Sequence, residues 1–318
     1  MAYTLNQLLN RLSFRQLQVF KAVYQQQSYS RAADELGLTQ PAVSAQIRQL
    51  EQALGQPVFE YVGKSLYVTA AGEQVIGVVR SMFGDLERLQ MELDELQGQV
   101  RGELRLAAVS TAQYVVPYLL EGFLKEYTQV DVRLRVVNRA QAVERLNENR
   151  DDLVIMGMVP DSRSLASMPF LDNELVPVVR ADDPLLNDSQ LTAQDFFDAG
   201  LLIREPGSGT RHALEDWCRS RRLTLNPRME LGSNAAIKHG VLAGLGVAVL
   251  PRLSIAAELR LDELKVLSLD GLPLRRSWCT VHPAGKHPTP VMQAFLDYIR
   301  ANLNSFYALV YGSTSEKP

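Results

Sequence analysis

Residues 29–48, YSRAADELGLTQPAVSAQIR, predict two short helices joined by a tight turn. Ser30 is placed to cap a helix over 31–36, and Gly37 is placed to end it in the left-handed conformation. Thr39 is placed to cap a second helix, with Pro41 in its first turn, where a missing N–H costs nothing. This order of helix, glycine turn and helix predicts a helix-turn-helix.

The second helix of this motif has one apolar and one polar side. Its apolar stripe consists of Val43, Ile47, Leu50 and Leu54, and Gly55 follows it. The opposite side carries short or hydrogen-bonding residues, namely Gln40, Ser44, Ala45, Arg48 and Gln49. Side chains of this kind read base edges in a DNA groove, so we expect contact with nucleic acid. The alternative is a helical hairpin in an unrelated core.

Net charge does not point to nucleic acid. The whole chain carries a formal charge of −3, and residues 13–69 hold five basic against four acidic residues. A DNA-binding protein usually carries a basic surface. The prediction therefore depends on the order of residues and not on bulk charge.

Two further elements follow the helix-turn-helix. Residues 57–68 alternate enough to predict a β-hairpin that turns at Gly63-Lys64. Residues 70–97 predict one long helix capped by Thr69. Its apolar residues repeat at spacings of four and three, as in a coiled coil: Val75, Val79, Met82, Leu86, Leu89, Leu93 and Leu96. We expect this seam to pair two subunits, rather than to pack on its own domain.

From residue 101 strands and helices alternate, which predicts a parallel sheet covered by helices. In the first set, strands are predicted at 102–109, 130–138 and 153–158, and helices after Ser110-Thr111 and at 141–149. In the second set, strands are predicted at 201–205, 228–231 and 246–250, and helices at 210–220 and 234–243. Extended stretches at 175–180 and 278–282 are expected to connect two lobes, and 288–303 to form a closing helix.

These patterns predict four segments. A DNA-binding domain spans 12–69, and a dimerisation helix spans 70–97. A ligand-binding α/β domain spans 101–303, with lobe 1 at 101–165 and 270–303 and lobe 2 at 168–268. A polar tail spans 304–318, of which 312–318 is expected to be disordered.

Two loops of the α/β region predict an anion site. Ser110-Thr111 and the run 204–211, REPGSGTR, each follow a strand and precede a helix. Such loops present free N–H groups and hydroxyls at a helix N-terminus, where anions bind. Either loop alone is explained by ordinary helix capping. Two of them in opposing lobes favour an anion between the lobes.

The chain lacks the sequence signatures of several other classes of protein. The chain has no apolar run of about 20 residues, and its first eleven residues do not form a signal peptide, so we expect a cytoplasmic protein with no membrane partner. No GxxxxGK[ST], HExxH or GxSxG motif occurs. Cys218 and Cys279 form no CxxC, and the four histidines show no metal spacing with them. We therefore predict no enzyme, no catalytic residue, no metal and no cofactor.

Residues 12–72 closely resemble the N-terminal domain of LysR-type transcriptional regulators. The segments that carry the resemblance are LSFRQLQVF, SRAADELGLTQPAVSAQIRQLEQALG, VF and VTAAG. The resemblance implies a winged helix-turn-helix, a long dimerisation helix and a two-lobed effector domain like periplasmic solute-binding proteins. It implies DNA contacts at Ser30, Arg31, Thr39, Gln40, Pro41, Ser44, Gln46, Arg48 and Lys64. One departure is the wing, where Tyr61 and Ser65 stand at positions that are commonly basic in the family.

By the same resemblance, the effector is expected between the lobes. The implied residues are Ser110, Thr111, Asn138, Gly157, Arg204, Ser208, Gly209, Thr210, Arg211 and Asn234. The 204–211 run is similar to that of regulators of Calvin-cycle (RuBisCO) operons, the CbbR/RbcR subgroup. Membership there implies a phosphorylated metabolite or NADPH as effector and carbon-fixation genes as targets. It also implies an inverted-repeat operator, a homodimer or homotetramer, and RNA polymerase as a partner.

Other interpretations remain open from the sequence. Regulators of sulfur or nitrogen genes carry similar loops, so a regulator of another metabolic operon, of sulfur, nitrogen or aromatic metabolism, is an alternative. A solute-binding protein with a divergent head would need export, for which the chain shows no signal. A repressor whose cleft has lost its ligand is a further alternative.

Overall fold

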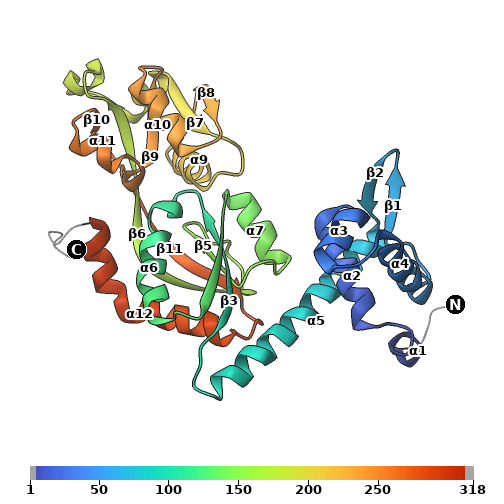
Figure 1. Ribbon diagram of the computed structural model, residues 1–318. Helices are drawn as coiled ribbons and strands as arrows, with labels where there is room; N and C mark the ends of the chain where they lie inside the picture. Colours follow the sequence, from blue (N-terminus) through green and yellow to red (C-terminus); the bar gives the residue numbers. More distant parts are fainter. Residues whose placement is uncertain (1–4, 312–318) are drawn as a thin grey trace. The chain divides into compact units, whose positions relative to one another are not determined.

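The computed structural model describes residues 5–311 (Figure 1). Contacts between Cα atoms divide the chain into two units on either side of the Gln90–Met91 bond, inside helix α5. Each unit has its own hydrophobic core.

The first unit is a winged helix-turn-helix. Its elements are α1 (Leu5–Leu9), α2 (Phe14–Gln26), α3 (Tyr29–Leu36), α4 (Gln40–Leu54), β1 (Phe59–Val62), β2 (Ser65–Val68) and the first part of α5 (Ala70–Glu95). Val19, Phe20, Val43, Ile47 and Leu50 are buried at the centre of the helices. The predicted stripe of α4 is therefore the side that packs against α2 and α3.

Gly72 lets α5 begin close to the hairpin. A Cβ atom at this position would lie 2.3 Å from the Val58 carbonyl oxygen, so no larger residue fits without backbone movement. The Thr69 hydroxyl accepts from the Gly72 N–H at 3.0 Å and caps α5, as predicted. The base of the wing and the start of α5 are thus fixed to each other.

The second unit contains one mixed sheet of nine strands. They are β3 (Gly102–Val109), β4 (Val130–Val137), β5 (Leu153–Met156), β6 (Leu165–Arg180), β7 (Leu201–Arg204), β8 (Pro227–Leu231), β9 (Val247–Pro251), β10 (Leu264–Val266) and β11 (Leu274–Pro283). The order along the sheet is β4-β3-β5-β11-β6-β9-β7-β8, with β10 paired to β6.

Two long strands join the lobes. β6 and β11 pair antiparallel along the length of β11, from Leu274 opposite Leu175 to Pro283 opposite Leu165. β11 also pairs with β5 in lobe 1, and β6 pairs with β9 in lobe 2. The two predicted connections are confirmed, as strands longer than expected.

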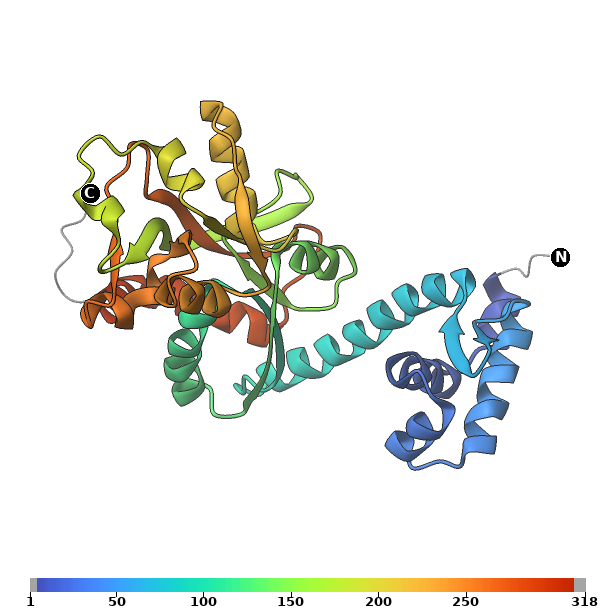
Figure 2. The same cartoon turned by 90° about the horizontal axis from the view of Figure 1, so that it is seen from above.

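Helices cover both faces of each lobe. In lobe 1, α6 (Val116–Glu126) and α12 (Pro290–Tyr311) lie on one face and α7 (Arg139–Asn147) on the other (Figures 1 and 2). In lobe 2, α8 (Ala193–Asp198) and α9 (Gly209–Arg221) pack into one cluster; α10 (Asn234–Leu242) and α11 (Ala256–Arg260) pack into another.

Several predicted boundaries are wrong. α3 is capped by Ser28, whose hydroxyl accepts from the Arg31 N–H at 3.3 Å, and Ser30 lies in the first turn. Only a 3-10 turn follows Ser110-Thr111, and α6 begins at Val116, because Pro117 cannot donate a helical hydrogen bond. α7 begins at Arg139 and not at 141.

The closing helix is longer than predicted. α12 continues to Tyr311, so the predicted tail does not begin at 304. The segment after Leu303 contains no proline or glycine before Gly312, and Phe306 is buried in the core of lobe 1. The prediction of disorder for 312–318 lies outside the described residues.

The heptad seam of α5 divides into two parts. Val79 is buried and Val75 partly buried in the core of the first unit, so these two residues pack on their own domain, contrary to prediction. From Met82 onward the seam is exposed: Leu86, Leu89 and Leu93 are each about half exposed (46%, 50% and 53%). Only this second part is available to a partner helix.

Candidate nucleic-acid interface and ligand cleft

The outward side of α4 carries a compact set of polar groups. The Thr39 hydroxyl caps the helix by accepting from the Ala42 N–H at 3.4 Å. Gln40 and Pro41 are exposed beside it, and Gln40 donates to the Ser44 hydroxyl at 3.1 Å. Ser44 and Gln46 are half-buried. These predicted residues therefore lie together over the first two turns of the helix.

Arg48 is the basic residue of this surface. Its side chain is exposed, and within residues 5–311 it has no hydrogen-bonding or ionic partner. Buried Ile47 and Leu50 on either side hold the helix so that Arg48 points away from the core. An uncommitted guanidinium can bind a guanine edge or a phosphate.

Arg31 and Ser30 lie at the start of α3. The Arg31 guanidinium donates to the Gln26 carbonyl at the end of α2, so part of its hydrogen-bonding capacity is used within the protein. Ser30 is exposed and makes no cap. Arg31 consequently ties α3 to α2, a function that the sequence did not indicate.

The wing is a two-stranded hairpin with the predicted turn. Val62 pairs with Ser65, and Gly63 takes φ +63°, a conformation that favours glycine. Lys64 is exposed at the tip and has no partner among the described residues. Tyr61 is 64% exposed and stacks on Tyr29, with ring centroids 6.4 Å apart. This aromatic contact joins the wing to α3.

A cleft lies between the lobes of the second unit. Its lining consists of Val109, Ser110, Thr111, Arg139, Gly157, Met158, Asn173, Leu175, Gly209, Thr210, Ala213 and Arg276. The empty space measures about 410 Å³, open mouth included. Five predicted effector residues are in this lining: Ser110, Thr111, Gly157, Gly209 and Thr210.

The Thr210 hydroxyl is buried beside the cleft without a partner among the residues that the structure describes. It lies in the first turn of α9, is buried (5% exposed), and its oxygen has no hydrogen-bonding partner within the described chain. Ser208 caps the same helix without a side-chain hydrogen bond. An unsatisfied buried hydroxyl beside free N–H groups at a helix N-terminus favours an anionic acceptor.

Arg204 and Arg211 do not line the cleft, contrary to prediction. Arg204 is buried and pairs with Glu205 through Nε and Nη2 at 2.7 and 2.9 Å. Arg211 pairs with Glu215 and Glu230, at 2.6 and 2.7 Å. Both guanidinium groups are neutralised within lobe 2, because acidic partners lie within hydrogen-bonding reach.

Asn138, Ser208 and Asn234 also lie outside the lining. Asn138 caps α7 by accepting from the Gln141 N–H at 3.0 Å. Asn234 is buried and accepts from Arg204 Nη1 at 2.8 Å. These residues lie at the starts of α7, α9 and α10 and are not part of the cleft lining.

Two arginines that the sequence did not reveal supply the positive charge. Arg139 follows β4 at the N-terminus of α7 and donates from Nε to the Met158 carbonyl at 3.0 Å. Arg276 projects from β11 and has no hydrogen-bonding or ionic partner within residues 5–311. Arg139 could have been found by the strand-to-helix logic applied to Ser110-Thr111, because it follows β4 and begins α7. Arg276 and Asn173 could not, because only strand pairing brings them to the cleft.

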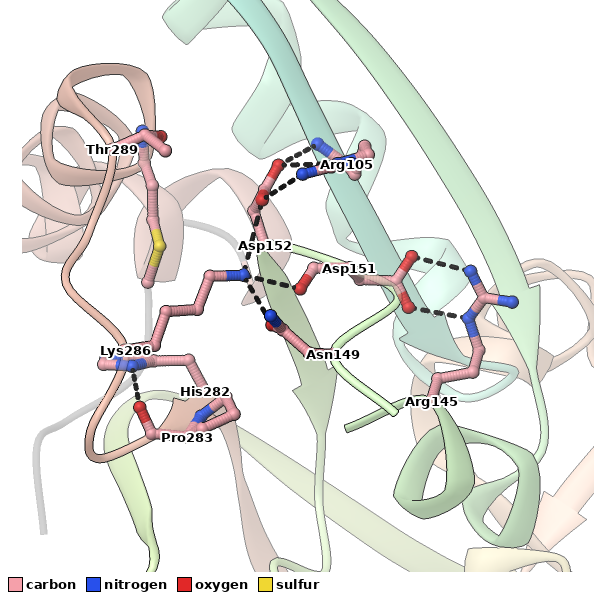
Figure 3. Close-up of polar contacts among 10 residues, drawn as sticks. Arg105, Arg145, Asn149, Asp151, Asp152, His282, Pro283, Lys286 and Thr289 are labelled. Atoms are coloured by element: carbon pink, nitrogen blue, oxygen red, sulfur yellow. Dashed lines mark hydrogen bonds and ion pairs between the residues drawn. The ribbon is translucent and has the colours of Figure 1, made fainter. Parts of the chain in front are cut away.

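A second polar cluster lies at the opposite end of β3 and β5 (Figure 3). Lys286 Nζ donates to Asn149 Oδ1 at 3.1 Å and to the Asp151 carbonyl at 2.9 Å, and lies 3.4 Å from Asp152 Oδ1. Burial lowers the pKa of Lys286, although Asp152 acts in the opposite direction.

The carboxylates of this cluster are paired as well. Burial opposes ionisation of Asp152, but hydrogen bonds from Arg105 hold its pKa below the ordinary value. Asp151 pairs with Arg145 at 2.6 and 2.7 Å. With three acceptors for three ammonium protons, the cluster fastens the start of β5 to the loop before α12 and offers no open position to a ligand.

Other types of site are not found in the described part of the chain. Residues 5–311 contain no group of three or more His, Cys, Asp or Glu side chains that could hold a metal ion. Within the same range no helix is long and apolar enough to span a membrane.

Comparison with known families decides the assignment. Residues 14–73 match the bacterial regulatory helix-turn-helix protein model of the LysR family, and residues 97–304 match the LysR substrate binding domain. The chain belongs to the LysR family of transcriptional regulators. The predicted fold class and the predicted membership in the LysR family are both confirmed.

Individual proteins of known function or structure are similar to this chain over most of its length. A RuBisCO operon transcriptional regulator of Acidithiobacillus ferrooxidans is 42% identical over 289 residues, which is 91% of this chain and 94% of that protein. The regulatory domain of CcmR from Synechocystis PCC6803, solved in complex with 2-PG, is 38% identical with a TM-score of 0.60. That match covers 63% of this chain and 97% of the domain.

A solved structure of a full-length LysR-type regulator has a similar fold over most of this chain. CbnR, solved in complex with its target DNA, covers 91% of this chain and 99% of its own, with a TM-score of 0.66 and 21% identity. At this identity the likeness concerns the fold alone.

Proposed function

We propose that this LysR-type regulator controls carbon-fixation genes in response to a small phosphorylated metabolite bound between its lobes. The observation that carries the proposal is the composition of the cleft lining. It contains Arg139, Arg276 and three hydroxyl side chains, and no aspartate or glutamate. A cleft of donors and positive charge favours an anion that only accepts hydrogen bonds.

The size of the cleft favours a small ligand. The empty space of about 410 Å³ includes the open mouth, so the enclosed part is smaller and suits a phosphorylated two- or three-carbon acid. A dinucleotide such as NADPH would leave much of itself in solvent. The 2-PG bound to the CcmR regulatory domain, which is 38% identical, supports the same class of ligand.

The DNA-binding residues form the second part of the proposal. We assign Thr39 and Ser44 to the DNA backbone, and Gln40, Pro41, Gln46 and Arg48 to bases or nearby phosphates. Lys64 would contact phosphate from the wing, with Ser30 and Arg31 at the margin. Exposure of Gln40, Pro41, Arg48 and Lys64 supports this assignment.

Assembly follows from the exposed part of the α5 seam. Two such helices would pair through Leu86, Leu89 and Leu93 and present two helix-turn-helix units to an inverted repeat. A homotetramer would join two of these dimers. Activation would then require a contact with RNA polymerase.

The test combines DNA and effector binding by the purified full-length protein. Fluorescence anisotropy would compare the affinity of the protein for the promoter of a RuBisCO or other carbon-fixation operon of the source genome with its affinity for shuffled DNA. Calorimetry would measure the binding of 2-phosphoglycolate, phosphoenolpyruvate, phosphorylated sugars and NADPH. Specific promoter binding that changes with one phosphorylated compound is expected. Specific binding only to promoters of other pathways would refute the carbon-fixation assignment, and failure of every anion to bind would refute the effector assignment.

A further inference from the structure

Two hydroxyls of the cleft accept hydrogen bonds from groups behind the lining. Arg204 Nη1 donates to Ser110 Oγ at 3.2 Å, and Trp278 Nε1 donates to Thr111 Oγ1 at 3.2 Å. Neither Arg204 nor Trp278 lines the cleft, and both are buried, at 3% and 0% exposure. The cleft hydroxyls are therefore approached from inside the protein by groups that can only donate.

Neither donor is free to reorient. The remaining contacts of Arg204 are to Glu205 and to Asn234 Oδ1, which hold its guanidinium plane. Trp278 is packed in the core of lobe 1. Arg204 belongs to lobe 2 and Ser110 to lobe 1, so their hydrogen bond also bridges the lobes.

The single proton of each hydroxyl is left without an acceptor in the described part of the chain. Within residues 5–311, neither Ser110 nor Thr111 donates a side-chain hydrogen bond to a protein acceptor. A hydroxyl that already accepts from an N–H group is a stronger donor, because hydrogen bonds in a chain polarise one another. Both protons are thus available to a ligand oxygen in the cleft.

We propose that Arg204 and Trp278 are positioning residues that each occupy one lone pair of a cleft hydroxyl and favour Ser110 and Thr111 as donors, so that the cleft prefers the fully deprotonated form of its phosphate ligand. The inference rests on the proposed function. A singly protonated phosphate carries an O–H that needs an acceptor, and the lining supplies no carboxylate for it, only the neutral side-chain oxygens of residues such as Asn173 and Thr210. The charged groups at the site are Arg139 and Arg276 in the lining and the Arg204–Glu205 pair behind it.

The test is the pH dependence of ligand affinity in a Trp278→Phe variant of the full-length protein. Phenylalanine keeps an aromatic ring in the core and removes the N–H donor together with part of the ring volume. Trp217→Phe is the matched control, because Trp217 packs on Phe197 in lobe 2 and does not line the cleft. Calorimetry would measure 2-phosphoglycolate affinity at pH 5.5 and 7.5 for the wild type and both variants.

For the wild type, affinity should fall by roughly fourfold from pH 7.5 to 5.5, since the second phosphate pKa is about 6. Trp278→Phe should bind roughly three- to tenfold more weakly at pH 7.5, the usual effect of one hydrogen bond. Its loss between the two pH values should be smaller, because Thr111 is then less polarised as a donor and has both lone pairs open to a protonated phosphate. Trp217→Phe should match the wild type at both pH values.

Each outcome has a distinct meaning. If the wild type binds and Trp278→Phe keeps the wild-type pH response, the positioning role is refuted and the proposed function stands. If neither 2-phosphoglycolate nor another anion of the panel binds the wild type, both are refuted. Should Trp278→Phe not fold, Arg204→Gln tests the same point at Ser110, because it removes the charge that polarises this hydroxyl.

Discussion

Arg276 lies directly opposite Asn173 in the antiparallel pairing of β11 with β6, and both residues line the cleft. Residues opposite each other in an antiparallel pair project from the same face of the sheet. The strands that join the lobes therefore supply a positive charge to the ligand site.

Replacing Arg276 with glutamine should weaken effector binding by about 2 kcal/mol, the usual contribution of a hydrogen bond to a charged group. Calorimetry with 2-phosphoglycolate measures the change. Arg275→Gln is the matched control, because Arg275 is the adjacent residue of β11, pairs with Glu174 and is not in the lining. Equal losses in the two variants would show a general electrostatic effect and contradict a direct contact of Arg276.

Thr210→Val and Thr111→Val should both weaken effector binding. The two variants should differ in their effect on the thermal stability of the protein. Thr210 has no protein partner to lose, so its replacement should leave the melting temperature unchanged. Thr111→Val removes the acceptor of the buried Trp278 N–H, and an unsatisfied buried donor costs about 1–3 kcal/mol. Thermal unfolding and calorimetry on the same samples separate the two effects. A destabilised Thr210→Val protein would contradict the assignment of its hydroxyl to the ligand.

Arg48→Ala should weaken specific operator binding by about 1–3 kcal/mol if the guanidinium contacts a base. Anisotropy titrations over a range of salt concentrations distinguish this from a phosphate contact, which would lower the salt slope by about one. Arg260→Ala removes the same charge from α11 in the second unit and serves as the control. Unchanged operator affinity in a folded Arg48→Ala protein would exclude Arg48 from the interface.

Leu89→Asp should dissociate the dimer, because an unpaired charge in an apolar seam is costly to bury. Leu89 is 50% exposed in the single chain, so the substitution should leave the fold of the subunit intact. Sedimentation measures the oligomeric state, and operator affinity should fall with it. Gln90→Asp adds the same charge at the neighbouring exposed position and should sediment as the wild type. An unchanged oligomer in Leu89→Asp would place the dimer interface elsewhere.

Lys286→Met should destabilise the second unit by about 3 kcal/mol, as expected when one partner of a buried ion pair is removed. The variant leaves Asn149 Oδ1 and the Asp151 carbonyl without their donor. Lys265→Met removes an exposed pair with Asp262, which should cost less than about 1 kcal/mol. Urea unfolding measures both. Effector affinity should be unchanged in Lys286→Met, because this cluster lies at the other end of the strands from the cleft.

The sequence was sufficient where structure depends on neighbours along the chain. Thr39, Gly37 and Gly63 were each predicted in the role that they fill, because caps and turns require particular residue types within a few positions. The apolar stripe of α4 likewise followed from helical periodicity. These local signals determined the helix-turn-helix and the alternating α/β order, and hence the family.

Only the tertiary structure decided which charged groups line the cleft. Arg204 and Arg211 have the right sequence context, but Glu205, Glu215 and Glu230 neutralise them. Arg276 has no local signal and reaches the cleft through the register of β11 against β6. A carboxylate partner offsets the charge of an arginine and occupies part of its donors. Such a partner can be a neighbour, as Glu205 is for Arg204, or distant in sequence, as Glu230 is for Arg211. For the same reason, the sequence alone did not show that Val75 and Val79 pack on their own domain while Leu89 remains exposed.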